Sequence, residues 1–149
     1  PRMSVRVSGP PDGHRGSRLD VDKLRRRAEA VLGAIGEPEA ELSIALVDDE
    51  EIAELNGRWR EKPRSTDVLS FSLVEGDFAD HRGGLLGDVV ISVETAARQA
   101  ALRHRGLDDV AARLMVHGVL HLIGHDHEDD AESRVMAAEE RRIWRLLSA

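Results

Sequence analysis

Three histidines lie close together in the sequence with the spacing of metal ligands. His117 is followed four residues later by His121 and six residues after that by His127. On a helix, residues four apart lie on one face, one turn from each other, so the first two imidazoles can reach a single ion. Gly124 allows the chain to leave that helix in a left-handed conformation and to bring His127 back to the same point.

The ligand set predicts a catalytic rather than a structural zinc site. Three neutral imidazoles leave the fourth position of a tetrahedral zinc ion open for water, whereas structural sites are usually closed by four ligands that include cysteine. This sequence contains no cysteine. A zinc-bound water has a lowered pKa and supplies hydroxide near neutral pH, so hydrolysis is the expected chemistry. Asp126, beside the third histidine, either orients a ligand imidazole through its carboxylate or only forms the turn.

The residue after the first histidine limits the class of hydrolase. In metalloproteases with the H-E-x-x-H motif, a glutamate at this position is the general base. Here the position is Gly118, which has no side chain to accept a proton. The sequence therefore disfavours an ordinary peptidase. It leaves phosphodiester, amide or ester hydrolysis, with the base supplied by another residue, by the metal-bound hydroxide or by the substrate.

The composition indicates a single soluble globular domain over residues 1–149. Hydrophobic residues make up 41% of the chain and charged residues 33%, and this length buries a substantial core. The sequence shows no apolar run long enough to cross a membrane and no apolar leader segment at its start. Zero cysteines fit a reducing cytoplasm. The net charge of −7 means that any contact with nucleic acid needs a local basic patch.

Hydrophobic periodicity predicts the elements that position the histidines. Alternating apolar residues predict strands at 4–8 and 42–47, and further strands are expected at 68–74 and, from a β-branched run, at 87–92. Three-and-four spacing predicts a helix at 19–35, and further helices are expected at 93–103 and 131–147. A further helix is expected from Asp48 or Asp49 to Leu55, ended by Asn56 and Gly57. Another helix is expected to begin at Asp108 and Asp109. One of its faces carries Val110, Leu114, His117 and His121.

The predicted order is β-α-β-α-β-β-α-α-α, which favours an α+β domain with a small mixed sheet of about four strands flanked by helices. The segments 9–17 and 75–84 are expected to be loops. Asp129 or Asp130 is expected to cap the last helix. Its apolar residues are expected in the core, and these are Val135, Met136, Ile143, Trp144 and Leu147.

Two basic segments are candidates for contact with RNA. Residues 58–64 contain Arg58, Arg60, Lys62 and Arg64 with Trp59 among them, a composition suited to phosphates and to base stacking. From these residues alone, a solvated loop is the plainer interpretation. The run at 25–27, three consecutive arginines within the first helix, is expected to be a solvated helix face.

The histidine motif resembles the signature of a known family. The stretch His117-Gly118-x-Leu120-His121-Leu122-x-Gly124-x-Asp126-His127 is similar to the pattern H-G-x-L-H-L-x-G-Y-D-H of the YbeY family of bacterial endoribonucleases. Two earlier stretches resemble further family patterns in the expected order. They are Asn56-x-x-Trp59-Arg60-x-Lys62-x-x-Ser65-Thr66-Asp67-Val68-Leu69-Ser70-Phe71 and Leu86-Gly87-Asp88-Val89-Val90-Ile91.

The resemblance implies a zinc-dependent endoribonuclease that prefers single-stranded RNA. Such an enzyme matures the 3′ end of the small-subunit ribosomal RNA and takes part in ribosome quality control, in contact with the small subunit and assembly factors. The implied fold is similar to that of the zincins. The resemblance places one zinc per chain on His117, His121 and His127 and a catalytic or substrate-binding arginine at Arg60. Arg58 and Lys62 are expected to bind substrate beside it.

Two positions depart from the family pattern. His125 stands where the family has tyrosine, and it is expected to be an exposed turn residue or, alternatively, an extra acid or base. Ser65 stands where the family has proline, which removes a fixed φ before Thr66 and predicts a looser loop. Neither position belongs to the ligand set.

Two other functions stay open at this point. One is a different zinc hydrolase, such as a peptidase or a small-molecule amidase. The other is a non-catalytic ribosome-assembly factor whose zinc only holds two helices together. This last function predicts that His117→Ala unfolds the protein, whereas an enzyme would only be inactivated.

Overall fold

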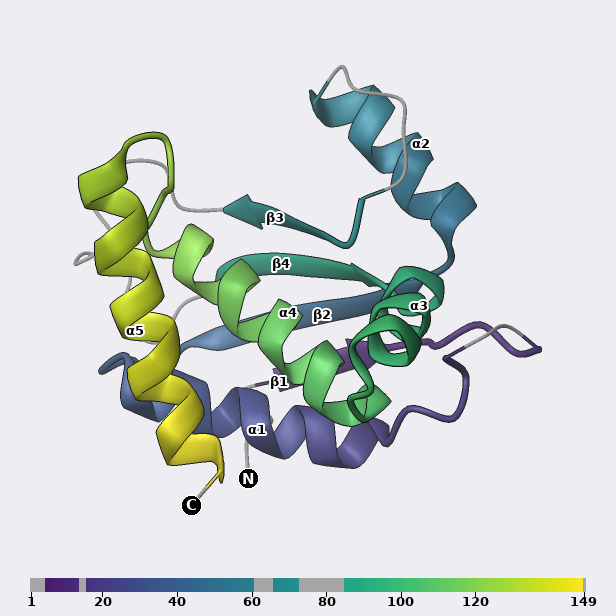
Figure 1. Ribbon diagram of the computed structural model, residues 1–149, viewed down its shortest axis with the longest axis horizontal. Coiled ribbons are helices and arrows are strands. Elements are labelled where there is room, and N and C mark those ends of the chain that lie inside the picture. Colours follow the sequence, from purple (N-terminus) through teal and green to yellow (C-terminus); the bar gives the residue numbers. More distant parts are fainter. Residues whose placement is uncertain (1–4, 14–15, 61–65, 73–84, 149) are drawn as a thin grey trace.

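The computed structural model describes residues 5–13, 16–60, 66–72 and 85–148, and of Trp59 and Arg60 it describes the backbone only (Figure 1). The described residues form four strands and five helices in the predicted order. They are β1 (Val5–Ser8), α1 (Val21–Ala34), β2 (Glu41–Val47), α2 (Asp49–Arg60), β3 (Val68–Ser72), β4 (Leu85–Ser92), α3 (Val93–Arg103), α4 (Leu107–Leu122) and α5 (Asp130–Ser148).

The four strands form one mixed sheet in the order β1-β2-β4-β3, which confirms the α+β prediction. Strands β1, β2 and β4 run parallel to one another, while β3 pairs antiparallel with β4. Within these pairings β3 therefore lies at one edge of the sheet and β1 at the other. The connections between the parallel strands contain helices, as parallel pairing requires.

The two faces of the sheet bury different residues. On one face, Leu42, Ile44 and Leu46 of β2 belong to the main core, together with residues of α1, α4 and α5. These three helices cover that face (Figure 1). On the other face, Ala45 and Val47 pack with Ile52 of α2 in a smaller cluster. The alternation expected for a strand buried on both faces is thus observed.

The helix that carries the first two histidines is held firmly by the core. Nine of the 16 residues of α4 are buried, and Gly106 precedes it as N-cap. Asp108 and Asp109 lie in its first turn, where carboxylates interact favourably with the helix dipole. Arg27 of α1 forms an ion pair with Asp109 at 3.0 Å, which ties the two helices together.

The second helix is longer than predicted, because Asn56 and Gly57 do not end it: α2 continues to Arg60. Asn56 is only 5% exposed, so it packs inside instead of capping an exposed end. Arg58 forms an ion pair with Glu54 one turn earlier at 2.9 Å, and such pairs support a helix. Glycine inside a helix costs only about 1 kcal/mol relative to alanine, which packing can offset. The basic segment therefore begins on a helix and not in a loop.

Smaller differences concern the ends of elements. Helix α1 begins at Val21 and not at residue 19, because Asp20 is its N-cap and accepts a hydrogen bond from the Lys23 N–H at 3.0 Å. Strand β4 begins at Leu85, two residues earlier than predicted. Asp129, not Asp130, caps α5 by accepting from the Glu132 N–H at 2.8 Å.

One residue predicted for the core lies outside it. Val135 is 57% exposed, whereas Met136 and Ile143 are fully buried. Residues 136 and 143 are seven apart and share one face of α5, while residue 135 is turned about 100° away from that face. Trp144 is half-buried, and Leu147 packs partly buried against the core.

Some predictions fall on residues that the structure does not describe. These are Lys62, Arg64, Ser65, the last two residues of the strand expected at 68–74, and the loop expected at 75–84. Among the described residues, none of the helices has the length and apolar character needed to cross a membrane.

Candidate metal centre

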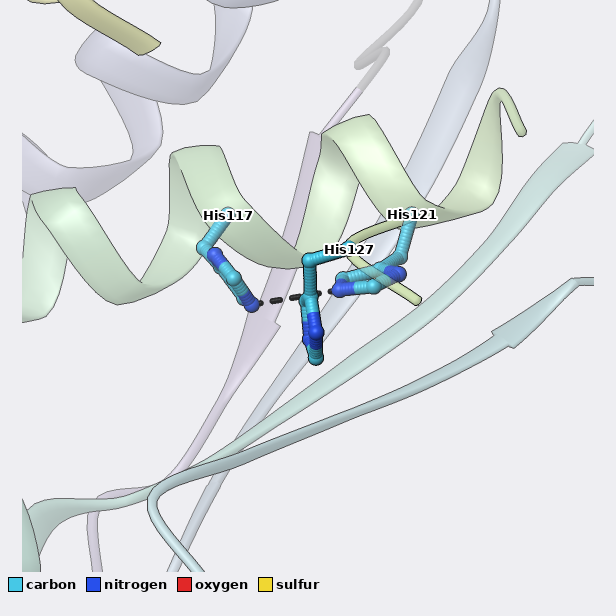
Figure 2. A group of neighbouring side chains, drawn as sticks. All are labelled: His117, His121 and His127. Carbon is cyan, nitrogen blue, oxygen red and sulfur yellow. Dashed lines mark hydrogen bonds between the residues drawn. The ribbon is translucent and has the colours of Figure 1, made fainter. Parts of the chain in front are cut away.

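Helix α4 brings His117 and His121 together, as predicted from their spacing. Their Nε2 atoms are 3.1 Å apart and their ring centroids 4.7 Å apart. Both side chains are half-buried and project from the same side of the helix toward one point (Figure 2). Because α4 is fixed by the core, the positions of these two imidazoles are fixed with it.

A tight turn after α4 returns the chain toward the same point. Ile123 is the C-cap and Gly124 has φ +101°, a left-handed conformation that glycine adopts without strain. The His125 N–H donates to the Leu120 carbonyl at 3.0 Å and the Gly124 N–H to the His121 carbonyl at 3.1 Å. These two bonds are the Schellman pattern of a helix C-terminus, so the predicted left-handed exit at Gly124 is confirmed.

His127 completes the cluster. Its ring centroid is 5.3 Å from that of His121 and 5.9 Å from that of His117. One ring nitrogen from each histidine lies within 4.8 Å of the other two. Tetrahedral nitrogen ligands at about 2.0–2.1 Å from zinc lie roughly 3.4 Å apart. The first two histidines are already close to this spacing, at 3.1 Å, and the ring nitrogen of the third lies within 4.8 Å of both, so the triad fits a metal ion.

A carboxylate from α5, which the sequence analysis missed, contacts the first histidine. His117 Nδ1 lies 3.4 Å from Glu140 Oε1, at the long end of hydrogen-bond distances. A proton held on Nδ1 by this carboxylate leaves the Nε2 lone pair facing the cluster, the orientation that a ligand needs. Glu140 lies one turn after the buried Met136 on α5, and this periodicity is a signal in the sequence that could have placed it on the inner face of the helix.

The carboxylate that the sequence did single out has a different contact. Asp126 Oδ1 accepts a hydrogen bond from the backbone N–H of His127 at 2.7 Å. This bond fixes the backbone of the third histidine, and a role toward a ligand imidazole stays a prediction. His125, predicted as an exposed turn residue, is half-buried, and its backbone N–H closes the turn after α4.

The histidines line a hollow of about 440 Å³ between α4 and the edge strand. Its other wall consists of residues 66–70 and Ser72, in β3 and the segment before it. The Ser70 hydroxyl donates to the Gly118 carbonyl at 2.8 Å, which joins the two walls. An extended chain lying along β3 would therefore pass the histidine cluster.

Gly118 is required by the contact between α4 and the sheet. A Cβ atom at this position would lie 2.7 Å from Val89 Cγ1 and 3.1 Å from Ser70 Oγ. A side chain there would thus run into β3 and β4, so this backbone has no room for the glutamate of the H-E-x-x-H peptidases.

The basic residues predicted to bind substrate are only partly placed. Arg60 is the last residue of α2, and its side chain and Lys62 lie outside the described residues. Arg58 is exposed and pairs with Glu54. Asp67, from the same family-like stretch, lines the hollow and accepts a hydrogen bond from Gln99 Nε2 at 3.1 Å. The roles of Arg58, Arg60 and Lys62 therefore stay predictions.

Known proteins are similar to this chain over nearly its whole length. The family model described as endoribonuclease YbeY matches residues 14–148. A protein of that name from Anaeromyxobacter dehalogenans is 48% identical over 144 residues, which is 96% of this chain and 71% of the relative. One from Geobacter sulfurreducens is 44% identical over 131 residues, 87% of each chain.

A solved structure agrees with the sequence relatives. The solution structure of a Thermotoga maritima protein superposes with a TM-score of 0.62 at 29% identity, covering 93% of this chain and 85% of that one. This likeness to a solved structure supports the α+β fold of the chain. The resemblance of the histidine motif is confirmed, and the chain belongs to the YbeY family of endoribonucleases.

Proposed function

We propose that this protein is a zinc-dependent endoribonuclease that cleaves single-stranded RNA in the hollow between α4 and β3. The observation that supports it most is the convergence of His117, His121 and His127 at one wall of an open hollow. Three histidine ligands are the set of a catalytic zinc ion. Family membership supplies the class of reaction, hydrolysis of an RNA phosphodiester.

The residues around the histidine cluster have different proposed roles. A bound zinc ion lowers the pKa of water and stabilises negative charge on phosphoryl oxygens. His117, His121 and His127 hold the ion through neutral imidazoles, and Glu140 retains the proton on Nδ1 of the first. Gly118 has no side chain that could act as general base, so another group must accept the proton of the attacking nucleophile. The walls of β3 orient the RNA chain beside the ion.

Arg60 is proposed to act on the phosphoryl group. An RNA cleavage transition state gathers negative charge on the phosphoryl oxygens, and a guanidinium can donate to two of them at once. The family pattern and the position of Arg60 at the end of α2 support this role. Arg58 and Lys62 are proposed to bind neighbouring phosphates, although Arg58 must first exchange its partner Glu54.

Replacing Arg60 tests this role against a structural one. Arg60→Ala should bind zinc normally and melt within a degree or two of the parent, since losing a side chain that acts only on the substrate should cost the fold at most about 0.5 kcal/mol. Its cleavage of single-stranded RNA should fall roughly 100-fold, the scale seen when one charge-stabilising donor is removed. Arg60→Lys should recover part of the loss, and Arg6→Ala, at an exposed arginine on the far edge strand β1, is the matched control. Parent-like cleavage by Arg60→Ala would refute the role.

The proposed place of this reaction is ribosome maturation. The family resemblance supports the small-subunit ribosomal RNA as substrate, assembly factors as partners and the cytoplasm as location. Depleting the protein in its host should then leave small-subunit RNA with an extended 3′ end, measured by end mapping. RNA ends unchanged after depletion would exclude this substrate.

The two competing functions make different predictions. A peptidase would cleave a peptide library, and the lack of room for a glutamate at position 118 argues against it. In a non-catalytic factor with structural zinc, His117→Ala would unfold the chain. The apolar core packs on the sheet through α1, α4 and α5 without using the imidazoles, so we expect that variant to stay folded.

A further inference from the structure

A second hollow, of about 170 Å³, lies between α3 and α4 and is rich in arginine. It is lined by Gln99, Arg103, Arg105, Val110, Arg113 and Leu114. A space of this size holds several water molecules and therefore one phosphate group. In a chain with a net charge of −7, three arginines around one small hollow form the kind of local basic patch that RNA contact requires.

In the described part of the chain, these three arginines are set apart by lining one hollow without carboxylate partners. Within that part, none of their guanidinium groups forms an ion pair, whereas the arginines on α1, α2, α3 and α5 that face carboxylates do, for example Arg27, Arg58 and Arg142. Arg113 lies over the Trp144 ring with its Cζ atom 4.3 Å from the centroid. Stacking on an aromatic face leaves the N–H groups at the edge of the guanidinium available to an anion.

The backbone fixes two of the three arginines relative to each other. His104 ends α3 in a left-handed conformation, φ 51° and ψ 46°, that residues other than glycine rarely adopt. The Arg105 N–H donates to the Ala100 carbonyl at 2.9 Å and closes the turn. Arg103 and Arg105 thus flank a defined turn, and both are exposed and reachable from solvent.

The arginine-lined hollow adjoins the metal centre. Gln99, in its wall, donates to Asp67, which lines the hollow of the histidines. Leu114, in the same wall, lies one turn before His117 on α4, and Figure 1 shows α3 beside the first half of that helix. From residue 113 to residue 121 the helix rises about 12 Å. At roughly 3.4 Å per stacked nucleotide this is three to four nucleotides of single strand.

We propose that Arg103, Arg105 and Arg113 bind a backbone phosphate of the RNA substrate three to four nucleotides from the cleaved linkage. This inference rests on the proposed function. Asp67 lies between the two hollows and repels phosphate, so the intervening RNA presents a sugar or base to it. A ribose 2′-hydroxyl can donate a hydrogen bond to the Asp67 carboxylate. The arginines hold the strand in register while the metal centre cleaves it.

Charge reversal on opposite edges of the molecule tests the assignment. Arg105→Glu and Arg6→Glu change the net charge equally, and Arg6 is exposed on β1, the strand at the far edge of the sheet from β3. Binding of single-stranded RNA to the zinc-loaded protein is followed by stopped-flow fluorescence anisotropy, before cleavage. Arg105→Glu should bind roughly tenfold more weakly than Arg6→Glu, because it loses a charge-assisted bidentate contact. The slope of log affinity against log salt concentration should be smaller in magnitude by about 0.7 for this variant.

A second variant, Arg103→Glu, separates loss of the phosphate contact from misfolding of one variant. Arg103→Glu should behave like Arg105→Glu, with melting temperatures near that of the parent in both. If both variants match Arg6→Glu in affinity and salt dependence, the arginines only contribute to the long-range field and the site does not exist. If the parent binds RNA yet never cleaves it, the proposed function fails, while the binding comparison still decides the site.

Substrates with one uncharged linkage locate the phosphate and identify its source. A single methylphosphonate three to four nucleotides from the cleaved linkage should weaken binding to the parent roughly tenfold and leave Arg105→Glu almost unaffected. The same loss in both proteins would overturn the contact. Stronger competition by inorganic phosphate than by chloride at equal ionic strength, with no dependence on the methylphosphonate position, would assign the hollow to a free phosphate ion instead.

Discussion

Among single residues, Glu140 controls how His117 presents its ring nitrogen. The carboxylate contacts Nδ1 at 3.4 Å, while Nε2 of the same ring lies 3.1 Å from Nε2 of His121. A carboxylate that holds the outer N–H of a ligand fixes the tautomer and raises the basicity of the imidazole. The metal affinity of the site should therefore depend on a residue that binds no metal itself.

Removing this carboxylate should weaken the metal site without unfolding the protein. Glu140→Ala is expected to lose zinc affinity roughly 10- to 100-fold, the usual effect of losing such a partner. Chelator competition measures it. Glu139→Ala is the matched control, because the neighbouring carboxylate pairs with Arg142 at 2.7 Å instead of with a histidine. Equal zinc affinity in the two variants would mean that Glu140 is only a surface acid.

The spacing of the histidines predicted the ligand cluster, and the contact with Glu140 could not be predicted in the same way. His117 and His121 follow from helix geometry, and Gly124 from the need for a left-handed exit, because both are local properties of the chain. Glu140 is 23 residues from His117 in sequence, and their contact depends on how α5 packs on α4. The arginine-lined hollow could not be predicted for the same reason, because it depends on how α3 packs against α4.

Among the elements, the close packing of α4 on the sheet depends on Gly118. A Cβ atom there would lie 2.7 Å from Val89 Cγ1, closer than real side chains approach. Gly118→Ala should therefore lower the free energy of unfolding by about 1–3 kcal/mol, as overpacking usually does. Gly33→Ala in α1 is the control, since its Cβ would meet no atom within 4 Å. It should raise stability by about 0.5–1 kcal/mol, and urea denaturation measures both. If the two substitutions changed the free energy of unfolding equally, α4 would have to lie farther from the sheet than the structure shows.

The starts of α2 and α3 are joined by one carboxylate. Asp49 accepts hydrogen bonds from the Ser92 hydroxyl at 2.5 Å and the Thr95 hydroxyl at 2.7 Å, and pairs with Arg98 at 2.7 Å. Burial by itself raises the pKa of the Asp49 carboxyl, but these hydrogen bonds and the charge of Arg98 together outweigh it and lower the pKa. The contacts also fix the direction in which α2 carries Arg60.

This lowered pKa predicts a pH-dependent contribution to stability. A group whose pKa is lower in the folded state stabilises the fold above its unfolded pKa, about 3.9 for aspartate, and loses that contribution as the pH falls through the folded value. Asp49→Asn should therefore be less stable than the parent at pH 7, and the difference should shrink below about pH 3.9. Thermal melts from pH 7 to 2.5 test it, with the exposed Glu50→Gln as control. A difference that is constant with pH would contradict it.

The order of the elements was predictable because periodicity is local, and two errors show where local signals fail. Asn56 and Gly57 are typical of a helix end, but burial of Asn56 and the Arg58–Glu54 pair carry α2 one turn further. Val135 is apolar and lies on an amphipathic helix, yet only the face through Met136 and Ile143 meets the core. Both outcomes depend on which surfaces the folded sheet offers.

In the whole molecule, the core and the metal centre are largely separate. The main core holds α1, α4 and α5 against the sheet, and the histidines project from its rim into the hollow beside β3 (Figure 2). Metal that binds only the folded state adds stability by mass action, and its removal should lower the melting temperature without unfolding the chain at 25 °C. We therefore expect that a metal ion held there would serve chemistry and would not be needed to form the fold.

The central claim is that RNA cleavage requires one metal ion on the three histidines. Zinc is titrated into chelator-treated protein, and cleavage of a labelled single-stranded RNA is measured at each addition. Cleavage should be lost after chelation, rise in proportion to added zinc and level off at about one ion per chain, the stoichiometry of a three-histidine site. His121→Ala, folded by circular dichroism, should stay inactive throughout. Cleavage by the metal-free protein, or cleavage by His121→Ala equal to that of the parent, would contradict the account.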